Sequence, residues 1–160
     1  MLRCSIIGRY FGCYKRNINK IDWKDTIPFV APIEGGQVIK VYDGDTITIA
    51  AKLPYKKSPL YRFSVRLNGI DCPEIKGNNN SEKECAKLGR DMLSNMILNK
   101  YVRLKEVKGE KYGRLLAEVY FEGKHINNWL LRNNLAVRYD GGTKISPEDW
   151  MKYHKEVEFT

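Results

Sequence analysis

The chain has 160 residues, of which 42% are hydrophobic and 29% are charged, a composition typical of one globular domain with a single hydrophobic core. No apolar run approaches the roughly 20 residues that a membrane-spanning helix requires, so the composition excludes such a helix. The 28 basic residues outnumber the 19 acidic ones, and the net charge of +9 attracts polyanions such as nucleic acid or an anionic membrane surface.

Residues 1–36 are expected to form a basic leader and linker ahead of a folded domain at residues 37–160. Residues 1–20 suit either a disordered leader or a membrane-surface segment with Cys4 and Cys13 S-acylated. The four cysteines lack CxxC spacing and a histidine at zinc-ligand spacing, which favours thiols in a reducing compartment. Without a clear signal peptide, an intracellular or membrane-peripheral location is favoured.

The first predicted elements are strands. Residues 37–53 alternate between apolar and polar positions on both sides of Asp43-Gly44-Asp45, which predicts a β-hairpin with its turn at these three residues. Residues 61–70 form the next predicted strand, and strict alternation puts Arg66 on one face with Ser64 and Asn68.

The second half of the chain mixes helices and strands. Residues 78–99 predict a helix that begins with a capping box of Ser81 and Glu84. Two strands (100–107 and 113–123), a short helix ending near Asn133-Asn134 and a last helix capped by Ser146 follow. Because the strands do not alternate regularly with helices, a small barrel is favoured over a parallel sheet.

Four carboxylates gather in two short segments, Asp43 and Asp45 in the first and Asp71 and Glu74 in the second. Carboxylates repel one another, so a cluster costs energy unless a cation lies between them, and hard oxygen ligands favour calcium, magnesium or manganese. Asp and Gly also occur in hairpin turns for backbone reasons alone. The acidic segments by themselves leave both interpretations open.

Two arginines favour the catalytic interpretation. Arg66 lies on the strand just before Asp71, and Arg114 opens an apolar strand after Gly113. A half-buried arginine needs a carboxylate or phosphate partner. Carboxylates that hold a cation, beside two guanidinium groups, match the requirements of phosphodiester hydrolysis: negative charge develops on the phosphoryl oxygens, and a carboxylate activates water.

The segments "VYDGDTI", "VRLNGIDCPE" and "KYGRLLAEVY", in this order, resemble the staphylococcal nuclease family over residues 38–144. The resemblance implies a mainly β fold with short helices (α+β), a five-stranded OB-fold barrel with about three helices. It also implies a calcium-dependent endonuclease that cuts DNA, RNA or both and leaves 3′-phosphate products, acting as a monomer without an obligate protein partner.

The same resemblance implies the site residues. Arg66 and Arg114 would clamp the phosphate, with Arg66 across the bound substrate from acids with which it need not pair, and Glu74 would be the general base. The implied calcium ligands are the side chains of Asp45 and Asp71 and the backbone carbonyl of Cys72, where the family usually has threonine, a change that could make the site sensitive to oxidation. The implied substrate-binding residues are Lys111, Tyr112 and Tyr139.

A non-catalytic OB-fold module that binds single-stranded nucleic acid is the alternative. Such a module has no use for Asp45, Asp71 and Glu74, which would repel a phosphate backbone in the absence of a metal ion. The presence of all three carboxylates favours the enzyme.

Overall fold

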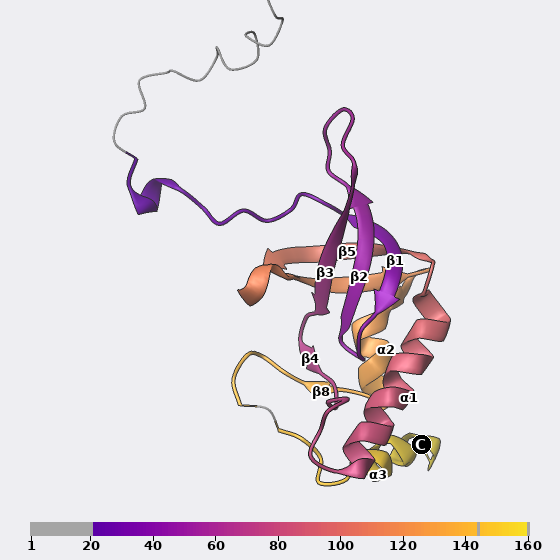
Figure 1. The fold of residues 1–160 in the computed structure, drawn as a ribbon. Helices are drawn as coiled ribbons and strands as arrows, with labels where there is room; N and C mark the ends of the chain where they lie inside the picture. Colours follow the sequence, from indigo (N-terminus) through magenta and orange to yellow (C-terminus); the bar gives the residue numbers. More distant parts are fainter. Residues whose placement is uncertain (1–20, 144, 160) are drawn as a thin grey trace, which may run out of the picture.

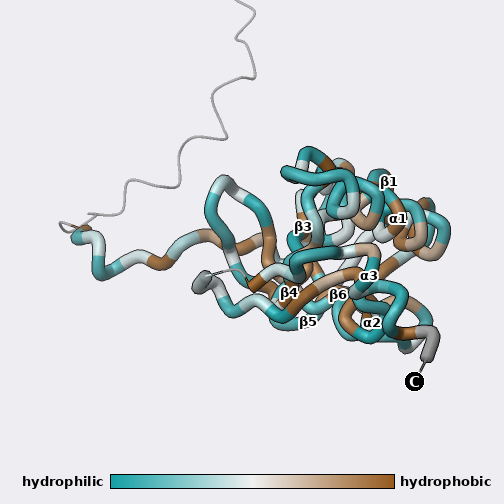
Figure 2. The backbone as a smooth tube through the Cα atoms, turned by 90° about the horizontal axis from the view of Figure 1, so that it is seen from below, coloured by the Kyte–Doolittle hydropathy of each residue, from teal (hydrophilic) through white to brown (hydrophobic). Residues whose placement is uncertain are grey.

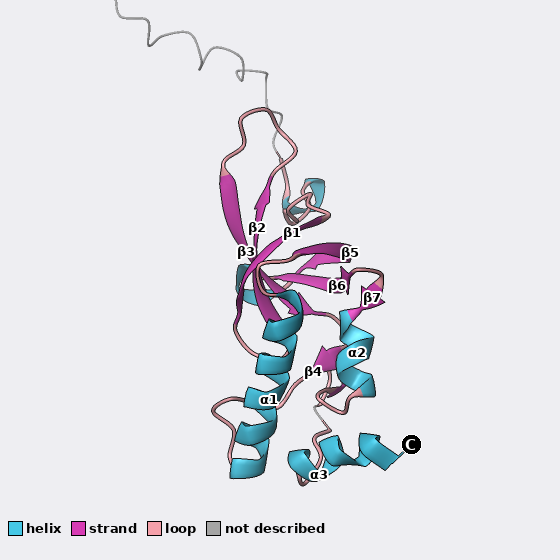
Figure 3. Ribbon diagram, turned by 90° about the vertical axis from the view of Figure 1, so that its right-hand side faces the viewer, coloured by secondary structure: helices cyan, strands magenta, loops and turns pink. Residues whose placement is uncertain are grey.

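The computed structural model describes residues 21–143 and 145–159, so the membrane-surface interpretation of residues 1–20, with Cys4 and Cys13, lies outside the described residues. Five strands form a barrel, and the helices gather at one end of it (Figures 1 and 3). The barrel strands are β1 (Gly35–Val41), β2 (Thr46–Lys52), β3 (Leu60–Leu67), β5 (Tyr101–Gly109) and β6 (Leu115–Phe121).

Antiparallel pairing joins neighbouring strands in the order β3-β2-β1-β5-β6, and a parallel pairing of β3 with β6 closes the barrel. A short β7 (Lys124–His125) extends β6, and β4 (Ile70–Asp71) pairs with β8 (Val137–Arg138) outside the barrel. The expected five-stranded OB-fold barrel with three helices is confirmed.

Alternation along β3 explains which residues reach the outside of the barrel. Val65 and Leu67 are fully buried in the core, whereas Ser64 and Arg66 between them are partly exposed. Successive side chains of a strand point to opposite faces, so Arg66 faces outward. The register opposes Thr46 of β2 to Arg66, which brings the residues just before β2 next to this arginine.

Three α-helices cover the opposite end from the β2–β3 loop (Figure 3). They are α1 (Asn80–Ile97), α2 (Ile126–Arg132) and α3 (Trp150–Lys155), and 3-10 turns occur at Trp23–Asp25, Lys111–Gly113 and Glu156–Phe159. Helix α1 buries Cys85, Leu93 and Ile97, which lie at helical spacing on one face, and Trp150 of α3 packs into the same core.

Two predicted helix caps were wrong. Asn79, not Ser81, caps α1: its side chain accepts a hydrogen bond from the Glu82 N–H at 2.7 Å. Ser81 instead bonds Asp149 and accepts from the Met151 N–H, which ties α1 to α3. Asp149, rather than Ser146, caps α3. Either side chain can cap a helix, and the tertiary contact between the two helices decides which residue does so.

The barrel packing reaches further toward the N-terminus than the strand prediction. Ala31 and Ile33 are buried in the core, and Gly35 and Gly36 lie inside β1 rather than before it. Upstream of them, Figure 2 shows hydrophobic residues interspersed with hydrophilic ones along the arm that leads from residue 21 to the barrel. Within residues 21–143 and 145–159, no helix has the length and hydrophobicity needed to cross a membrane.

Candidate active site

One guanidinium joins the two acidic segments. Arg66 donates from Nη1 to Asp45 Oδ1 at 2.9 Å and from Nη2 to Asp71 Oδ1 at 2.5 Å. Asp45 stands directly before β2 and Asp71 ends β4, so the fold brings together three residues that the sequence predicted for one site. The sequence did not require Arg66 to pair with these acids; in the structure it lies between them, because Thr46 and Arg66 are paired across β2 and β3.

The carboxylate of Asp45 is held by further donors. Its side chain also accepts from Thr46 Oγ1 at 2.8 Å and from the Cys72 backbone N–H at 3.3 Å. Asp45 is only 4% exposed. Burial and the nearby charges of Asp43 and Asp71 raise the pKa of Asp45 to about 7, although Arg66 and the Thr46 hydrogen bond act in the opposite direction. Burial, the largest of these effects, together with the neighbouring carboxylates outweighs the stabilisation of the Asp45 charge by Arg66.

The raised pKa of the buried Asp45 carboxyl predicts a pH dependence of stability in the absence of divalent metal. Asp45 has a pKa of about 7 in the folded chain against an ordinary value of 3.8. The folded state thus binds more protons than the unfolded state between about pH 4 and pH 7. The contribution of Asp45 to stability is fully present below about pH 4 and is lost as the pH rises to about 7, at roughly 1.4 kcal/mol per pKa unit.

Urea unfolding in EDTA at pH 5 and pH 8 measures this dependence, with Asp45→Asn as the comparison. We expect the parent to lose more stability than Asp45→Asn between the two pH values. Equal losses in both proteins would contradict the assignment of the effect to Asp45.

Cys72 belongs to the second acidic segment and packs against the first. Its side chain is 4% exposed, and a Cβ on Gly44 would come within 2.8 Å of its Sγ, so glycine is required at the centre of the first segment. Burial, followed by the charges of Asp45 and Asp43, raises the pKa of the Cys72 thiol well above its ordinary range. A buried thiol that keeps its proton is a poor nucleophile, and the predicted sensitivity to oxidation has no support in this geometry.

Glu74 follows Asp71 on the loop that leads to α1. Its side chain is exposed, while its backbone N–H donates to Glu82 Oε1 at 3.2 Å. Glu82 also accepts from the Asn78 N–H at 3.0 Å, and a Cβ on Gly77 would collide with its carboxylate. Glu82 therefore fixes the backbone of the loop that carries Glu74. The sequence prediction missed this role, for which an acid in the first turn of a helix is the only signal.

Arg114 forms a bidentate pair with Glu110, at 2.5 Å from Nε to Oε2 and 2.7 Å from Nη2 to Oε1. It precedes β6, whose residue Leu116 pairs with Arg66 on β3. Because Leu115 is buried, Arg114 faces outward as Arg66 does. Burial lowers the pKa of Arg66, but the negative charges of Asp45, Asp71 and Glu110 together raise it above its ordinary value. Glu110 thus links the two arginines electrostatically, and the sequence prediction missed it.

A groove of about 1000 Å³ opens beside this cluster and is called here the Arg66 groove. Arg66, Glu110 and Lys111 line one part of it, and Arg138 and Tyr139 line another. The backbone N–H of Tyr139 donates to the Gly69 carbonyl at 3.1 Å, which fixes the position of this tyrosine. Two of the predicted substrate-binding residues therefore share one cavity with Arg66. The third, Tyr112, is 93% exposed at the turn next to Lys111 and has a positive φ of 65°.

The donor chemistry fits a hard divalent cation. Asp45 and Asp71 supply carboxylate oxygens on either side of the partly exposed Arg66, the charge of Asp43 acts on Asp45, and such oxygens are the ligands that calcium prefers. Within the described part of the chain, no group of three His, Cys, Asp or Glu side chains is arranged to hold a metal ion. A cation at this position would therefore take other ligands as well, such as backbone carbonyls and water.

Comparison with known proteins finds a family model and several curated relatives. A family model described as staphylococcal nuclease homologue matches residues 64–157, more than half of the chain. The match covers the second half of β3 with Arg66, the Asp71–Glu74 segment, and Arg114 with β6, whereas Asp43 and Asp45 lie before it.

The similar proteins with curated names are endonucleases. A probable endonuclease of Schizosaccharomyces pombe is 32% identical over 69% of this chain and 57% of the relative. An uncharacterized endonuclease of Escherichia coli is 29% identical over 66% of this chain and 61% of the relative, and one of Haemophilus influenzae is 32% identical over 64% and 51%. The chain spans about six-tenths or less of the length of these curated relatives.

Proposed function

The chain belongs to the staphylococcal nuclease homologue family, and on that premise we propose that it is a calcium-dependent endonuclease. It hydrolyses phosphodiester bonds in DNA, RNA or both and leaves 3′-phosphate ends. The observation that carries the proposal is the cluster of Asp45, Arg66 and Asp71 at the edge of the Arg66 groove, with Glu74 on the adjoining loop.

Arg66 and Arg114 bind the scissile phosphate. Arg66 projects from the outer face of β3, and Arg114 lies just before β6, the strand that pairs in parallel with β3. Both arginines already hold carboxylates, and a phosphate is an anionic group that can take the place of a carboxylate. A guanidinium keeps its charge at any working pH and binds two oxygens at once. As the attacking water adds to phosphorus, negative charge grows on the phosphoryl oxygens, and donors already held in position stabilise that charge more than they stabilise the substrate.

Glu74 acts as the general base. Its carboxylate takes a proton from the attacking water as the bond from the water oxygen to phosphorus forms and the P–O5′ bond breaks. The leaving 5′ oxygen takes a proton from solvent water and becomes a hydroxyl, so the phosphate remains on the 3′ side. An exposed glutamate whose backbone is fixed by Glu82 is suited to this role, because its side chain is open to water while its position is held.

Asp45 and Asp71, with the backbone carbonyl of Cys72, would hold the calcium ion. When bound, the ion would neutralise charge on a phosphate oxygen and favour ionisation of a nearby water. The carboxylates contribute by staying together in a buried position despite their mutual repulsion, which Arg66 and the donors to Asp45 partly relieve. A threonine hydroxyl at position 72 is not required, because a backbone carbonyl is the same for any residue.

Lys111, Tyr112 and Tyr139 bind the rest of the nucleotide. Lys111 and Tyr139 line the Arg66 groove, and Tyr112 extends into solvent on the adjacent turn, where its ring is open to a base. All of the proposed residues come from one chain, so we propose that the protein acts as a monomer.

A cleavage assay tests the proposed function. The full chain is incubated with single-stranded DNA or RNA labelled at its 5′ end, in calcium or in EDTA. We expect cleavage with calcium, none with EDTA, and products that become substrates for a ligase only after their 3′ phosphate is removed. Full activity in EDTA would overturn the calcium requirement. Binding of the strands without cleavage in calcium would favour the non-catalytic OB-fold module.

A further inference from the structure

The β2–β3 hairpin carries a concentration of positive charge that the proposed catalytic site does not use. Residues 46–70 contain five basic residues and no acidic one. Within the described residues, Arg66 is the member of this set that forms ion pairs. The other four, which form what we call the cationic hairpin (residues 52–62), are Lys52, Lys56, Lys57 and Arg62.

The cationic hairpin has a regular, hydrogen-bonded structure. Strands β2 and β3 stay in register from Thr46 opposite Arg66 to Lys52 opposite Leu60, without a bulge. At the tip, Ser58 is buried, and its Oγ accepts from the Leu53 N–H at 2.9 Å. The hairpin projects from the end of the barrel opposite the helices (Figures 1 and 3). A preorganised projection with unpaired cations binds a polyanion at a lower entropic cost than a flexible loop would.

Aromatic rings accompany these charges. Tyr55 and Tyr61 lie on the two sides of the hairpin tip, and their hydroxyls share a hydrogen bond at 2.6 Å. Tyr55 is 51% and Tyr61 is 38% exposed, so each ring presents a surface to solvent. Tyr61 shares the face of Phe63 and Val65 rather than that of Arg62, so the two rings accompany Lys56 and Lys57 at the tip. A single strand that reaches the tip can stack its unpaired bases on them.

The hairpin continues the face that carries the proposed phosphate clamp. Arg62, Ser64 and Arg66 occupy alternate positions on β3, so their side chains lie on the same face, which is the outside of the barrel. Arg62 lies about 13 Å from Arg66 along the strand, as four residues at strand spacing imply. A strand bound at Arg66 can therefore extend along β3 toward the tip without crossing an acidic side chain of β2 or β3.

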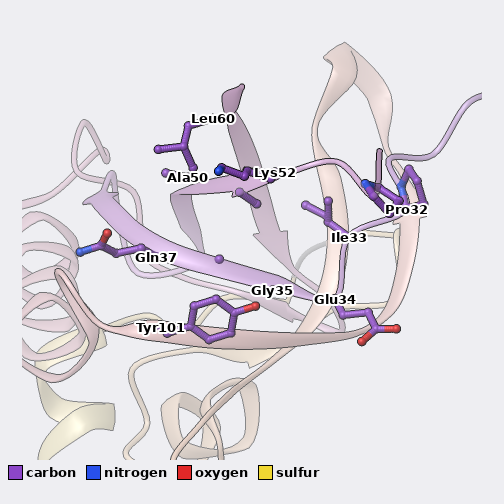
Figure 4. Close-up of a pocket in the computed structure, with 12 residues that line it drawn as sticks. Pro32, Ile33, Glu34, Gly35, Gln37, Ala50, Lys52, Leu60 and Tyr101 are labelled. Carbon is purple, nitrogen blue, oxygen red and sulfur yellow. The ribbon is translucent and has the colours of Figure 1, made fainter. Parts of the chain in front are cut away.

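A second groove, of about 550 Å³, opens at the base of the hairpin (Figure 4). The groove is lined by Lys52 and Leu60 of the hairpin, Tyr101 of β5 and Gln37 of β1. Figure 4 shows these side chains around the backbone of β1, which forms the floor of the groove. The floor is open because Gly35 and Gly36 have no side chains: a Cβ there would approach the backbone of neighbouring strands to 2.2 and 2.6 Å. Ala50, which pairs with Arg62, lines the same groove.

We propose that the cationic hairpin and the groove at its base form an extended binding site for single-stranded nucleic acid. This site holds the part of the strand that lies beyond the scissile phosphate. The inference rests on the proposed nuclease function for its place in the reaction, but the binding itself does not require cleavage. Its effect on catalysis is to make KM fall as the strand becomes long enough to reach the hairpin.

The salt dependence of binding tests the proposal. Binding of the full chain to a fluorescent 20-nucleotide single strand is measured in EDTA, which prevents the proposed cleavage. The hairpin variant combines Lys56→Gln, Lys57→Gln and Arg62→Gln. The control combines Lys87→Gln, Arg132→Gln and Lys155→Gln, three exposed residues on the helices at the opposite end, and has the same net charge.

The hairpin variant should bind at least about tenfold more weakly at low salt. Its plot of log affinity against log salt should also become shallower by about 2, because three phosphate contacts are lost and each contributes roughly 0.7 to the steepness of the plot for a single strand. The control should keep the slope of the parent. Tyr55→Ala should weaken binding by roughly tenfold without changing the slope, because stacking releases no counterions.

Two results would overturn the proposal. The first is an equal change of the salt slope in the hairpin variant and in the control. The second is that the hairpin is needed to capture vesicles containing phosphatidylserine but is not needed to bind the oligonucleotide. The two proposals fail separately. Hairpin-dependent binding in EDTA without cleavage in calcium would reject the nuclease alone. Cleavage in calcium with a salt slope that ignores the hairpin would reject the hairpin site alone.

Discussion

Glu74→Gln is expected to lower kcat for calcium-dependent cleavage by about 10²–10⁴-fold, the range that a general base contributes. Glutamine has the size of glutamate and can still accept a hydrogen bond, but it cannot take the proton of the attacking water. Because the Glu74 side chain is exposed, the free energy of unfolding should change by no more than about 0.5 kcal/mol. KM should change little, since Glu74 is proposed to contact the water rather than the strand.

Initial rates over a range of single-stranded DNA concentrations separate these effects. Glu84→Gln is a matched control, because Glu84 is also exposed and lies on the nearby helix α1. The variant at position 84 should keep the activity of the parent. If Glu74→Gln retains full kcat, another group must accept the proton, and the proposed mechanism is wrong.

Arg66→Met and Arg114→Met should both lower kcat/KM by about 10²–10³-fold, as expected for loss of a donor to the developing charge. Their effects on stability should differ. Removal of Arg66 leaves the buried carboxylates of Asp45 and Asp71 without their cation, which costs roughly 3–5 kcal/mol. Removal of Arg114 leaves only the more exposed Glu110, and the loss should stay below about 1 kcal/mol.

Urea unfolding in EDTA measures the difference in stability, and cleavage in calcium measures the loss of activity. Arg66→Lys covers the case in which Arg66→Met does not fold: it keeps one charge at the site but loses the fork that reaches both carboxylates. A stability loss of the same size in Arg66→Met and Arg114→Met would contradict the central position of Arg66. Unchanged cleavage in either variant would remove that arginine from the proposed clamp.

Much of the barrel and part of the site could be predicted from the sequence because they depend on local patterns. Alternation around Asp43-Gly44-Asp45 predicted a hairpin, which the pairing of Val41 with Ile47 confirms. The same period predicted that Arg66 and Ser64 share one face, as the buried Val65 between them shows. The order of the three segments indicated the family, which the match over residues 64–157 confirms.

Features that depend on contacts between distant segments could not be predicted in this way. Ser81 has a good sequence context for a helix cap, but it bonds Asp149, which is 68 positions away. The pairing of Arg66 with Asp45 depends on the register of β2 and β3. The roles proposed for Glu74, Lys111 and Tyr139 stay predictions, since position alone does not establish a chemical role.

The closure of the barrel by β3 and β6 has a consequence for the synthesis of the protein. Val65 and Leu115 pair although they are fifty positions apart, and β1 also pairs with the distant β5, whereas the β1–β2 and β2–β3 pairings join near neighbours in the chain. Long-range pairings form late, because the ends of a long loop must first meet. Arg66 and Arg114 therefore come together only after β6 has left the ribosome and docked. A nascent chain that stops before that point has its acidic segments but no complete phosphate clamp, so the proposed nuclease gains its activity only once the fold has closed.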